Sequence, residues 1–168
     1  DIDAMLSDDL PTLEEVRQSY EIGFDRYAVV VFHGLTTEPP DVVGATARSL
    51  IEAVREVGLP AVVIYPNNDP GSEAILDVYA ELAGDADLRI FPSVRFESFL
   101  TLLHGAEVVI GNSSAGIREA PLYGVPTVNI GTRQRDRFHY ESIISCGNSR
   151  AQISAALDAA LSIERVAA

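Results

Sequence analysis

The stretch that decides the fold is Tyr27-Ala28-Val29-Val30-Val31-Phe32-His33, an apolar run with three valines at its centre that ends on a histidine. A continuous apolar run of this length is typical of a strand buried on both faces, so we predict a strand over residues 27–32. Similar short runs recur along the chain and predict four more strands. They cover residues 61–65, 88–91, 107–110 and 126–130.

Helical patterns lie between these runs. Thr12 and Glu15 have the spacing of a capping box, which predicts a short helix before the first strand. The other predicted helices cover residues 41–57, 72–83, 96–104, 115–123 and 149–163. A glycine closes four of them and is expected to form a left-handed cap; these are Gly58, Gly84, Gly105 and Gly124. Strict alternation of strand and helix predicts an α/β fold, a doubly wound parallel sheet with helices on both faces, in one domain over residues 1–168.

The position of a ligand site follows from the order of the strands. In a doubly wound sheet with the order 3-2-1-4-5, the first and fourth strands are neighbours, and ligands bind at their carboxyl ends. The first strand ends at His33, and the fourth runs into Gly111-Asn112-Ser113-Ser114. The fifth leads into Gly131-Thr132-Arg133. We therefore expect His33, the two serines and Arg133 at one edge of the sheet.

Composition excludes several classes of protein. The chain has 168 residues and a formal net charge of −13, with 25 acidic residues and 12 basic ones, all of them arginine. Such a charge opposes binding to nucleic acid or to an anionic membrane surface. No stretch is long and apolar enough for a membrane span, and the acidic first residues do not resemble a signal peptide, so a cytoplasmic protein is expected. The lone Cys146 excludes an intrachain disulfide and a thiolate zinc cluster.

Phosphate-binding chemistry is suggested by residues 111–119. The chain has no G-x-G-x-x-G and no P-loop motif, so no cofactor and no metal are expected. Small residues at a strand end followed by a helix N-terminus favour an anion such as phosphate, with Ser113 and Ser114 as added donors. Glu119 could accept hydrogen bonds from a sugar diol. Alternatively, Ser114 only caps the helix and Glu119 only complements its dipole.

Arginine and histidine supply the remaining candidates. Arg133-Gln134-Arg135-Asp136-Arg137 is the densest positive cluster of the chain, and Arg133, nearest the strand end, could bind a diphosphate. The other two arginines fit a solvated loop better. His33 could donate a hydrogen bond or move a proton, although an isolated histidine is often structural. His104 and His139 have no second signal.

Four motifs in order resemble the UDP-N-acetylglucosamine 2-epimerase family. They are Phe32-His33, Pro66-Asn67-Asn68-Asp69-Pro70-Gly71-Ser72, the run from Gly111 to Glu119, and Gly131-Thr132-Arg133-Gln134. The resemblance covers the chain from about Tyr27 to the last helix. It implies the Rossmann-like C-terminal half of a glycosyltransferase-B type fold, with a UDP-sugar in the cleft between two halves.

The resemblance also implies roles for particular residues. Ser113, Ser114 and Arg133 would hold the diphosphate, Glu119 the ribose hydroxyls, and the stretch from Val94 to Phe99 the uracil. His33 is the candidate catalytic residue beside the diphosphate and the sugar. Asn67 would line the same pocket. The sequences His33-Gly34-Leu35-Thr36 and Ser113-Ser114-Ala115-Gly116 are more similar to the hydrolysing branch, which makes N-acetylmannosamine and UDP through a glycal for sialic acid biosynthesis.

In the family, the groups that move protons at the sugar ring come mainly from the N-terminal half. The resemblance therefore implies that this chain alone is inactive and that the N-terminal domain of the same enzyme is its partner, with a homo-oligomer also possible. Two alternatives stay open. The chain could be the nucleotide-binding half of a UDP-sugar glycosyltransferase, or a non-catalytic domain that binds sugar nucleotides.

Overall fold

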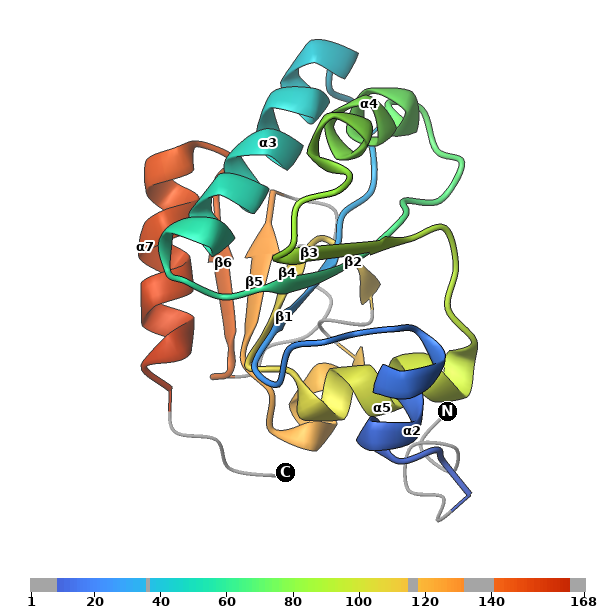
Figure 1. Ribbon diagram of the computed structural model, residues 1–168. Coiled ribbons are helices and arrows are strands. Elements are labelled where there is room, and N and C mark those ends of the chain that lie inside the picture. The colour runs from blue at the N-terminus through green and yellow to red at the C-terminus, as the bar shows by residue number, and fades with distance from the viewer. Residues whose placement is uncertain (1–8, 36, 115–117, 132–140, 164–168) are drawn as a thin grey trace.

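A computed structural model describes residues 9–35, 37–114, 118–131 and 141–163, and its centre is a six-stranded parallel sheet (Figure 1). The strands lie in the order β3-β2-β1-β4-β5-β6, so the predicted order of the first five is confirmed. Their bounds are β1 Ala28–Val31, β2 Ala61–Ile64, β3 Leu88–Phe91, β4 Val108–Gly111, β5 Thr127–Ile130 and β6 Ile143–Cys146. All pairs of neighbours are parallel.

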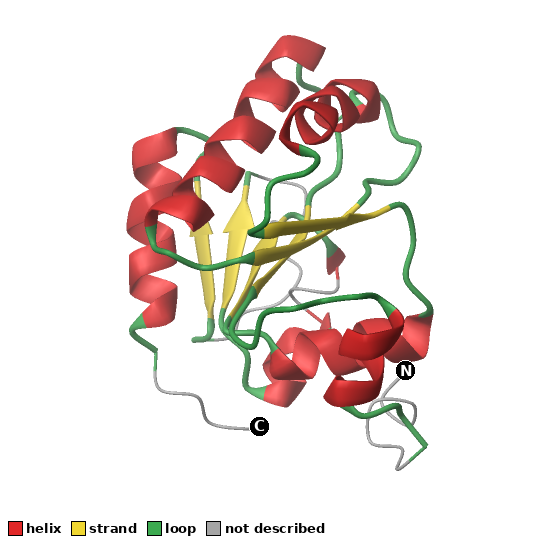
Figure 2. Cartoon of the chain, viewed as in Figure 1, coloured by secondary structure: helices red, strands yellow, loops and turns green. Residues whose placement is uncertain are grey.

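Helices cover both faces of the sheet, as a doubly wound fold requires (Figure 2). The helices α3, α4 and α7 lie on one face, and α2, α5 and the short 3-10 helix η1 pack on the other (Figure 1). Their bounds are α2 Leu13–Ser19, α3 Pro40–Glu56, α4 Ser72–Leu82, α5 Phe96–Gly105, η1 Ala120–Tyr123 and α7 Arg150–Leu161. The Rossmann-like fold class predicted from the sequence is therefore confirmed.

The edge strand β6 was not predicted. Its segment, Ile143–Cys146, has two apolar residues followed by a serine, and its side chains are half-buried or exposed because only β5 adjoins it. The predicted helix over residues 115–123 falls partly on residues 115–117, outside the described part of the chain. Its described end is the 3-10 turn η1.

Three of the predicted glycine caps have the expected backbone and one does not. Gly58, Gly84 and Gly124 have positive φ. The prediction for Gly105 is wrong, because this residue is the last of α5 and the extended cap is Ala106. Glycine is needed there for space: a Cβ at position 105 would lie 2.7 Å from the hydroxyl oxygen of Tyr27, which donates a hydrogen bond to the Leu102 carbonyl.

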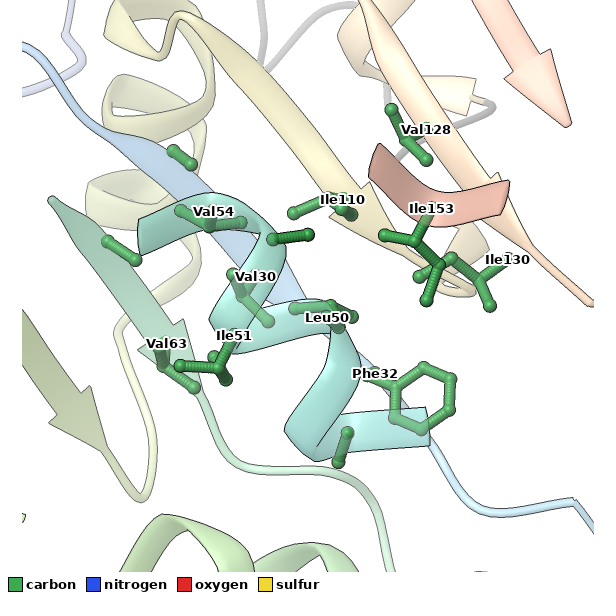
Figure 3. Close-up of a cluster of buried hydrophobic side chains, with 14 of the residues drawn as sticks. Val30, Phe32, Leu50, Ile51, Val54, Val63, Ile110, Val128, Ile130 and Ile153 are labelled. Atoms are coloured by element: carbon green, nitrogen blue, oxygen red, sulfur yellow. The ribbon is translucent and has the colours of Figure 1, made fainter. Parts of the chain in front are cut away.

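Side chains of β1 divide between two cores, which is why the strand is apolar at every position. Ala28, Val30 and Phe32 face the core under α3, α4 and α7, whereas Val29 and Val31 face the core under α2 and α5. Figure 3 shows the first core, where Leu50 and Ile51 of α3 meet side chains from the strands and from α7. We call the core under α3, α4 and α7 the α3 core, and the core under α2 and α5 the α5 core.

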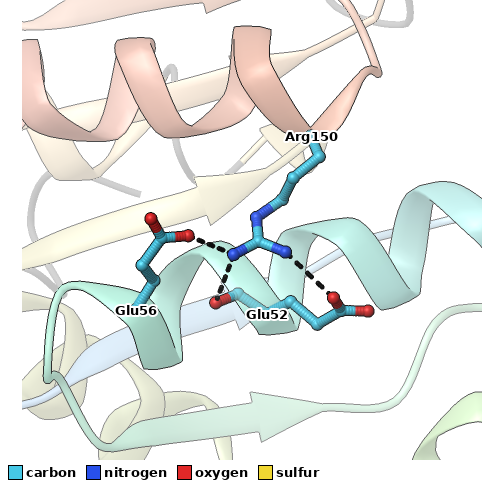
Figure 4. Close-up of polar contacts among 3 residues, drawn as sticks. All are labelled: Glu52, Glu56 and Arg150. Carbon is cyan, nitrogen blue, oxygen red and sulfur yellow. Dashed lines mark hydrogen bonds and ion pairs between the residues drawn. The ribbon is translucent and has the colours of Figure 1, made fainter.

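A charged contact joins α7 to α3 above the α3 core. The guanidinium of Arg150 donates to the carboxylates of Glu52 and Glu56 and to the Glu52 carbonyl oxygen (Figure 4). Because these groups are partly exposed, the pairs add orientation more than stability. Among the described residues, no helix is long and apolar enough to cross a membrane.

Candidate functional site

The carboxyl ends of β1 and β4 approach each other closely because Gly111 has no side chain. A Cβ at position 111 would lie 2.0 Å from the Val31 carbonyl oxygen, and the φ of Gly111 is +147°. The backbone N–H of Asn112 then donates to that same Val31 oxygen, at 3.2 Å. The parallel ladder therefore continues beyond the last regular residue of β4 and brings Asn112 beside His33.

The side chain of Asn112 pairs with the backbone of His33. Its Oδ1 accepts a hydrogen bond from the His33 amide at 2.7 Å, and its Nδ2 donates to the His33 carbonyl oxygen at 2.9 Å. The carboxamide thus acts as an extra peptide group and extends the β1–β4 pairing by one residue. Asn112 is 1 % exposed, so this pair is shielded from water.

The imidazole of His33 is held by the loop that follows β2. The backbone N–H of Asn67 donates to its Nδ1 at 3.0 Å. Asn67 is held in turn, because its Oδ1 accepts from the Asp69 amide at 3.1 Å in an Asx-turn. An Nδ1 that accepts a hydrogen bond carries no proton, so the neutral ring has its proton on Nε2.

The loops after β1 and β2 touch through their backbones. A Cβ at position 34 would lie 2.2 Å from the Pro70 carbonyl oxygen and 3.0 Å from the carbonyl carbon of Gly71. The Ser72 hydroxyl donates to the Asp69 carbonyl at 2.7 Å and closes the second loop onto the start of α4. Gly34 is therefore required for the contact that holds Asn67 against His33.

A pocket of about 370 Å³ opens at this edge of the sheet. Five residues that the sequence singled out line it, from the ends of β1, β2, β3 and β4 and from α5; they are His33, Asn67, Val94, Phe99 and Ser113. Apolar side chains of the α5 core form its inner wall, and Tyr65 and Phe96, the two exposed large apolar residues of the described chain, stand in its lining at 37 % and 47 % exposure. The pocket lies at the carboxyl ends of β1 and β4, the switch point where the strand order reverses. This is where ligands generally bind in such sheets.

Glu119 lies beyond the lining of this pocket, at the start of η1. Its Oε2 is buried and has no hydrogen-bond partner in the described part of the chain. Its charge is felt by Tyr123, whose pKa is raised by burial first and by the Glu119 carboxylate second. The Tyr123 ring stacks on His104, with ring centres 4.6 Å apart. A buried carboxylate oxygen of this kind suits a ligand hydroxyl.

The structure leaves some predicted residues apart from the pocket. Ser114 is described as helical but does not line it. Arg133 and the arginines after it lie outside the described residues. Cys146 ends β6, and burial raises the pKa of its thiol to about 11, so it stays protonated near neutral pH. Among residues 9–35, 37–114, 118–131 and 141–163, no three His, Cys, Asp or Glu side chains gather as a metal site would require.

Sequence reasoning gave no role to two residues of the site, Asn112 and Tyr65. Asn112 was quoted within its motif but given no role, and only its buried side chain reveals the pairing with His33. Tyr65, directly after β2, was also given no role, whereas Phe96, the first residue of α5, falls within the stretch 94–99 that the resemblance assigned to the uracil. The exposure of both rings is visible only once the chain is folded. The available signal for Asn112 was its position directly after a buried strand, where a polar side chain that stays buried needs a hydrogen-bond partner.

Fold and pocket together define a doubly wound α/β domain with a candidate ligand site at the switch point of its sheet. The family model for UDP-N-acetylglucosamine 2-epimerase matches residues 1–168. The chain therefore belongs to the UDP-N-acetylglucosamine 2-epimerase family.

Individual relatives agree with this family. The chain is 43% identical over 163 residues to UDP-N-acetylglucosamine 2-epimerase of Neisseria meningitidis serogroup B, which covers 97% of the chain and 43% of that relative. It is 29% identical over 146 residues to UDP-N,N'-diacetylbacillosamine 2-epimerase (hydrolyzing) of Legionella pneumophila, covering 80% of the chain and 38% of the relative. The chain thus spans less than half the length of these curated relatives.

Solved structures show the same fold. The UDP-GlcNAc 2-epimerase of Methanocaldococcus jannaschii, in complex with UDP-GlcNAc and UDP, superposes with a TM-score of 0.72 at 18% identity. The match covers 91% of this chain and 43% of that one. At this identity the likeness establishes the arrangement of the elements, and residue roles need their own evidence.

Proposed function

We propose that this chain is the UDP-binding, C-terminal domain of a UDP-N-acetylglucosamine 2-epimerase of the hydrolysing branch, acting in the cytoplasm. The observation that carries the proposal is the pocket at the sheet edge, whose lining unites His33, Asn67, Val94, Phe99 and Ser113 from segments far apart in the sequence. Membership of the family supports the substrate class, and the relative described as hydrolyzing supports the branch.

In this proposal, each part of the UDP moiety would meet a particular group of the domain. The exposed rings of Phe96 and Tyr65, together with Phe99 in the same lining, would offer apolar contact for the uracil. Ser113 supplies a hydroxyl at the end of β4 for the diphosphate, and Ser114 and Arg133 would act beside it. Glu119, whose Oε2 has no partner among the described residues, would accept a hydrogen bond from a ribose hydroxyl.

In the proposed reaction, UDP leaves from C1 of the sugar while a base removes the proton on C2, which gives a glycal; water then adds to release N-acetylmannosamine. His33 would donate a hydrogen bond to the departing diphosphate and thereby stabilise its charge. The acidic groups that act on the sugar ring would come from an N-terminal domain of the same enzyme.

Isothermal titration of the chain with UDP tests the binding part. We expect saturable binding of UDP, much weaker binding of uridine, and a loss of affinity of about tenfold in Glu119→Gln, since a hydrogen bond to a charged group is removed. Asp158→Asn is the matched control, because it removes one negative charge from the exposed face of α7 and should leave the affinity unchanged. Equal affinity for UDP and uridine, or none for either, would reject the proposal.

The branch is tested on a polypeptide that also carries the N-terminal domain. Release of free N-acetylmannosamine and UDP from UDP-N-acetylglucosamine supports the hydrolysing branch, whereas UDP-N-acetylmannosamine as product assigns the other one. A product that forms only with an added sugar acceptor would indicate a glycosyltransferase, and binding without turnover would indicate a sensor domain.

A further inference from the structure

We propose that Asn112 and the backbone N–H of Asn67 are positioning groups that fix His33 as a neutral hydrogen-bond donor, with its proton on Nε2, at the wall of the pocket. This inference deepens the proposed function and rests on it only for the identity of the ligand. His33 is held at three places by two other segments of the chain. Asn112 pairs with its amide and its carbonyl, and Asn67 donates to its ring.

The clamp on the backbone requires an amide side chain. Asn112 must accept from the His33 N–H and donate to the His33 carbonyl at the same time. A carboxylate of the same shape offers two acceptors, so one oxygen would face the His33 carbonyl oxygen with no proton between them. With Asn112 buried, water cannot relieve that repulsion. The position of the His33 backbone therefore depends on the single nitrogen Nδ2 of Asn112.

The clamp on the ring selects its tautomer. Because the Asn67 amide donates to Nδ1, the Nδ1–H tautomer would place two hydrogens against each other at 3.0 Å between the nitrogens. The donor is a backbone group, and it is held by the Asx-turn to Asp69 and by the close contact of Gly34 with Pro70. A fixed Nε2–H suits a phosphate oxygen, which is an acceptor only, and makes His33 a donor and not a base.

The first test is the tautomer of His33 in the free chain, measured at about pH 8 by two-bond proton–nitrogen correlation spectra with labelled histidine. His33→Gln assigns the signals. We expect one tautomer, with Nδ1 unprotonated, in the wild type and in Asn67→Ala, which keeps the backbone N–H. Asn67→Pro removes that N–H, and its His33 signals should move to the averaged values of a free imidazole. A wild-type ring with its proton on Nδ1, or an Asn67→Pro ring that keeps the wild-type tautomer, would overturn the proposal.

The second test concerns Asn112. In Asn112→Asp we expect UDP affinity to fall about tenfold, because the His33 donor is displaced from the phosphate, with a shift of the His33 ring signals. Unchanged ring signals and unchanged affinity in a folded Asn112→Asp would overturn the role of Asn112. If that variant does not fold, Asn112→Ala with the same two readouts decides the role of Asn112, and Asn67→Pro decides the role of the Asn67 N–H. Failure of the proposed function is a separate outcome: a wild type with a fixed tautomer that binds no UDP.

Discussion

Helices pack on both faces of the sheet, but the two cores differ in how completely their side chains are buried. The α3 core is covered by three helices, α3, α4 and α7, and its largest side chains, such as Leu50 and Ile153, are fully buried. The α5 core is richer in aromatic and half-buried residues, and at the carboxyl edge four of its members, Val31, Ile64, Val94 and Phe99, form the wall of the pocket. The α3 core is covered along its length, whereas the α5 core leaves apolar surface in the wall of the pocket, where we propose that the ligand binds.

The difference indicates which side chains serve stability and which are placed to serve the proposed binding. Ala28 and Val30 of β1, and Phe32 directly after it, belong to the α3 core, and the residues between them belong to the α5 core. A substitution in the α3 core should therefore change the free energy of unfolding and spare the pocket, whereas one in the pocket wall of the α5 core should affect the ligand more than the fold. Variants on each face can break this distinction or sharpen it.

The largest effect is expected for Leu50→Ala in the α3 core. Leu50 is 0 % exposed in the middle of α3, so the truncation leaves a cavity and should lower the free energy of unfolding by about 3 kcal/mol. Urea unfolding measures this loss. UDP affinity at a temperature where the variant is folded should equal that of the wild type; a large drop in affinity would show that the two faces are coupled.

Gly34→Ala should come next, at the edge where both faces meet the pocket. The added methyl group would overlap the Pro70 carbonyl, so the loops must separate at a cost of about 2 kcal/mol. Because Asn67 moves with its loop, the His33 ring should also lose its single tautomer. Gly23→Ala is the control, since a Cβ there would meet nothing within 4 Å. Equal melting temperatures for the two variants would contradict the close contact.

Phe99→Ala in the α5 core should cost less stability, about 1 kcal/mol, because its side chain is already half-exposed in the pocket wall. Its effect on UDP should be larger than that of Leu50→Ala, since the uracil would lose an apolar surface. Urea unfolding gives the loss of stability in Leu50→Ala and Phe99→Ala, and calorimetry gives the loss of UDP affinity. We expect the larger loss of stability in Leu50→Ala and the larger loss of affinity in Phe99→Ala. A Phe99→Ala variant with full affinity would remove this residue from the proposed uracil contact.

The least reactive behaviour is expected for the thiol of Cys146, which packs against the α3 core. Because burial raises the pKa of its thiol to about 11, only about one molecule in ten thousand carries the thiolate at pH 7. Alkylation with iodoacetamide should be very slow at pH 7 and should accelerate about tenfold for each pH unit towards 11. An alkylation rate at pH 7 equal to that of a solvent-exposed cysteine would contradict the burial of the Cys146 thiol at the end of β6.

Much of the fold could be predicted from the sequence because its signals are local. The run from Tyr27 to Phe32 is apolar at every position, as a strand between two cores requires. The edge strand β6 could not be predicted, since it is short and half-exposed and is specified by its pairing with β5. Gly105 carried the signal of a cap, although its small size serves the packing of Tyr27.

The site divides in the same way. The sequence by itself determined that His33, Asn67 and Ser113 follow three different strands, and the rule for parallel sheets placed them at one edge. Only the tertiary structure decided what these residues do to one another. The pairing of Asn112 with His33 spans 79 positions, and the donation from Asn67 to the ring spans 34. Such contacts depend on backbones brought within hydrogen-bond distance, at places where Gly34 and Gly111 leave no side chain between them, and a linear pattern does not record that approach.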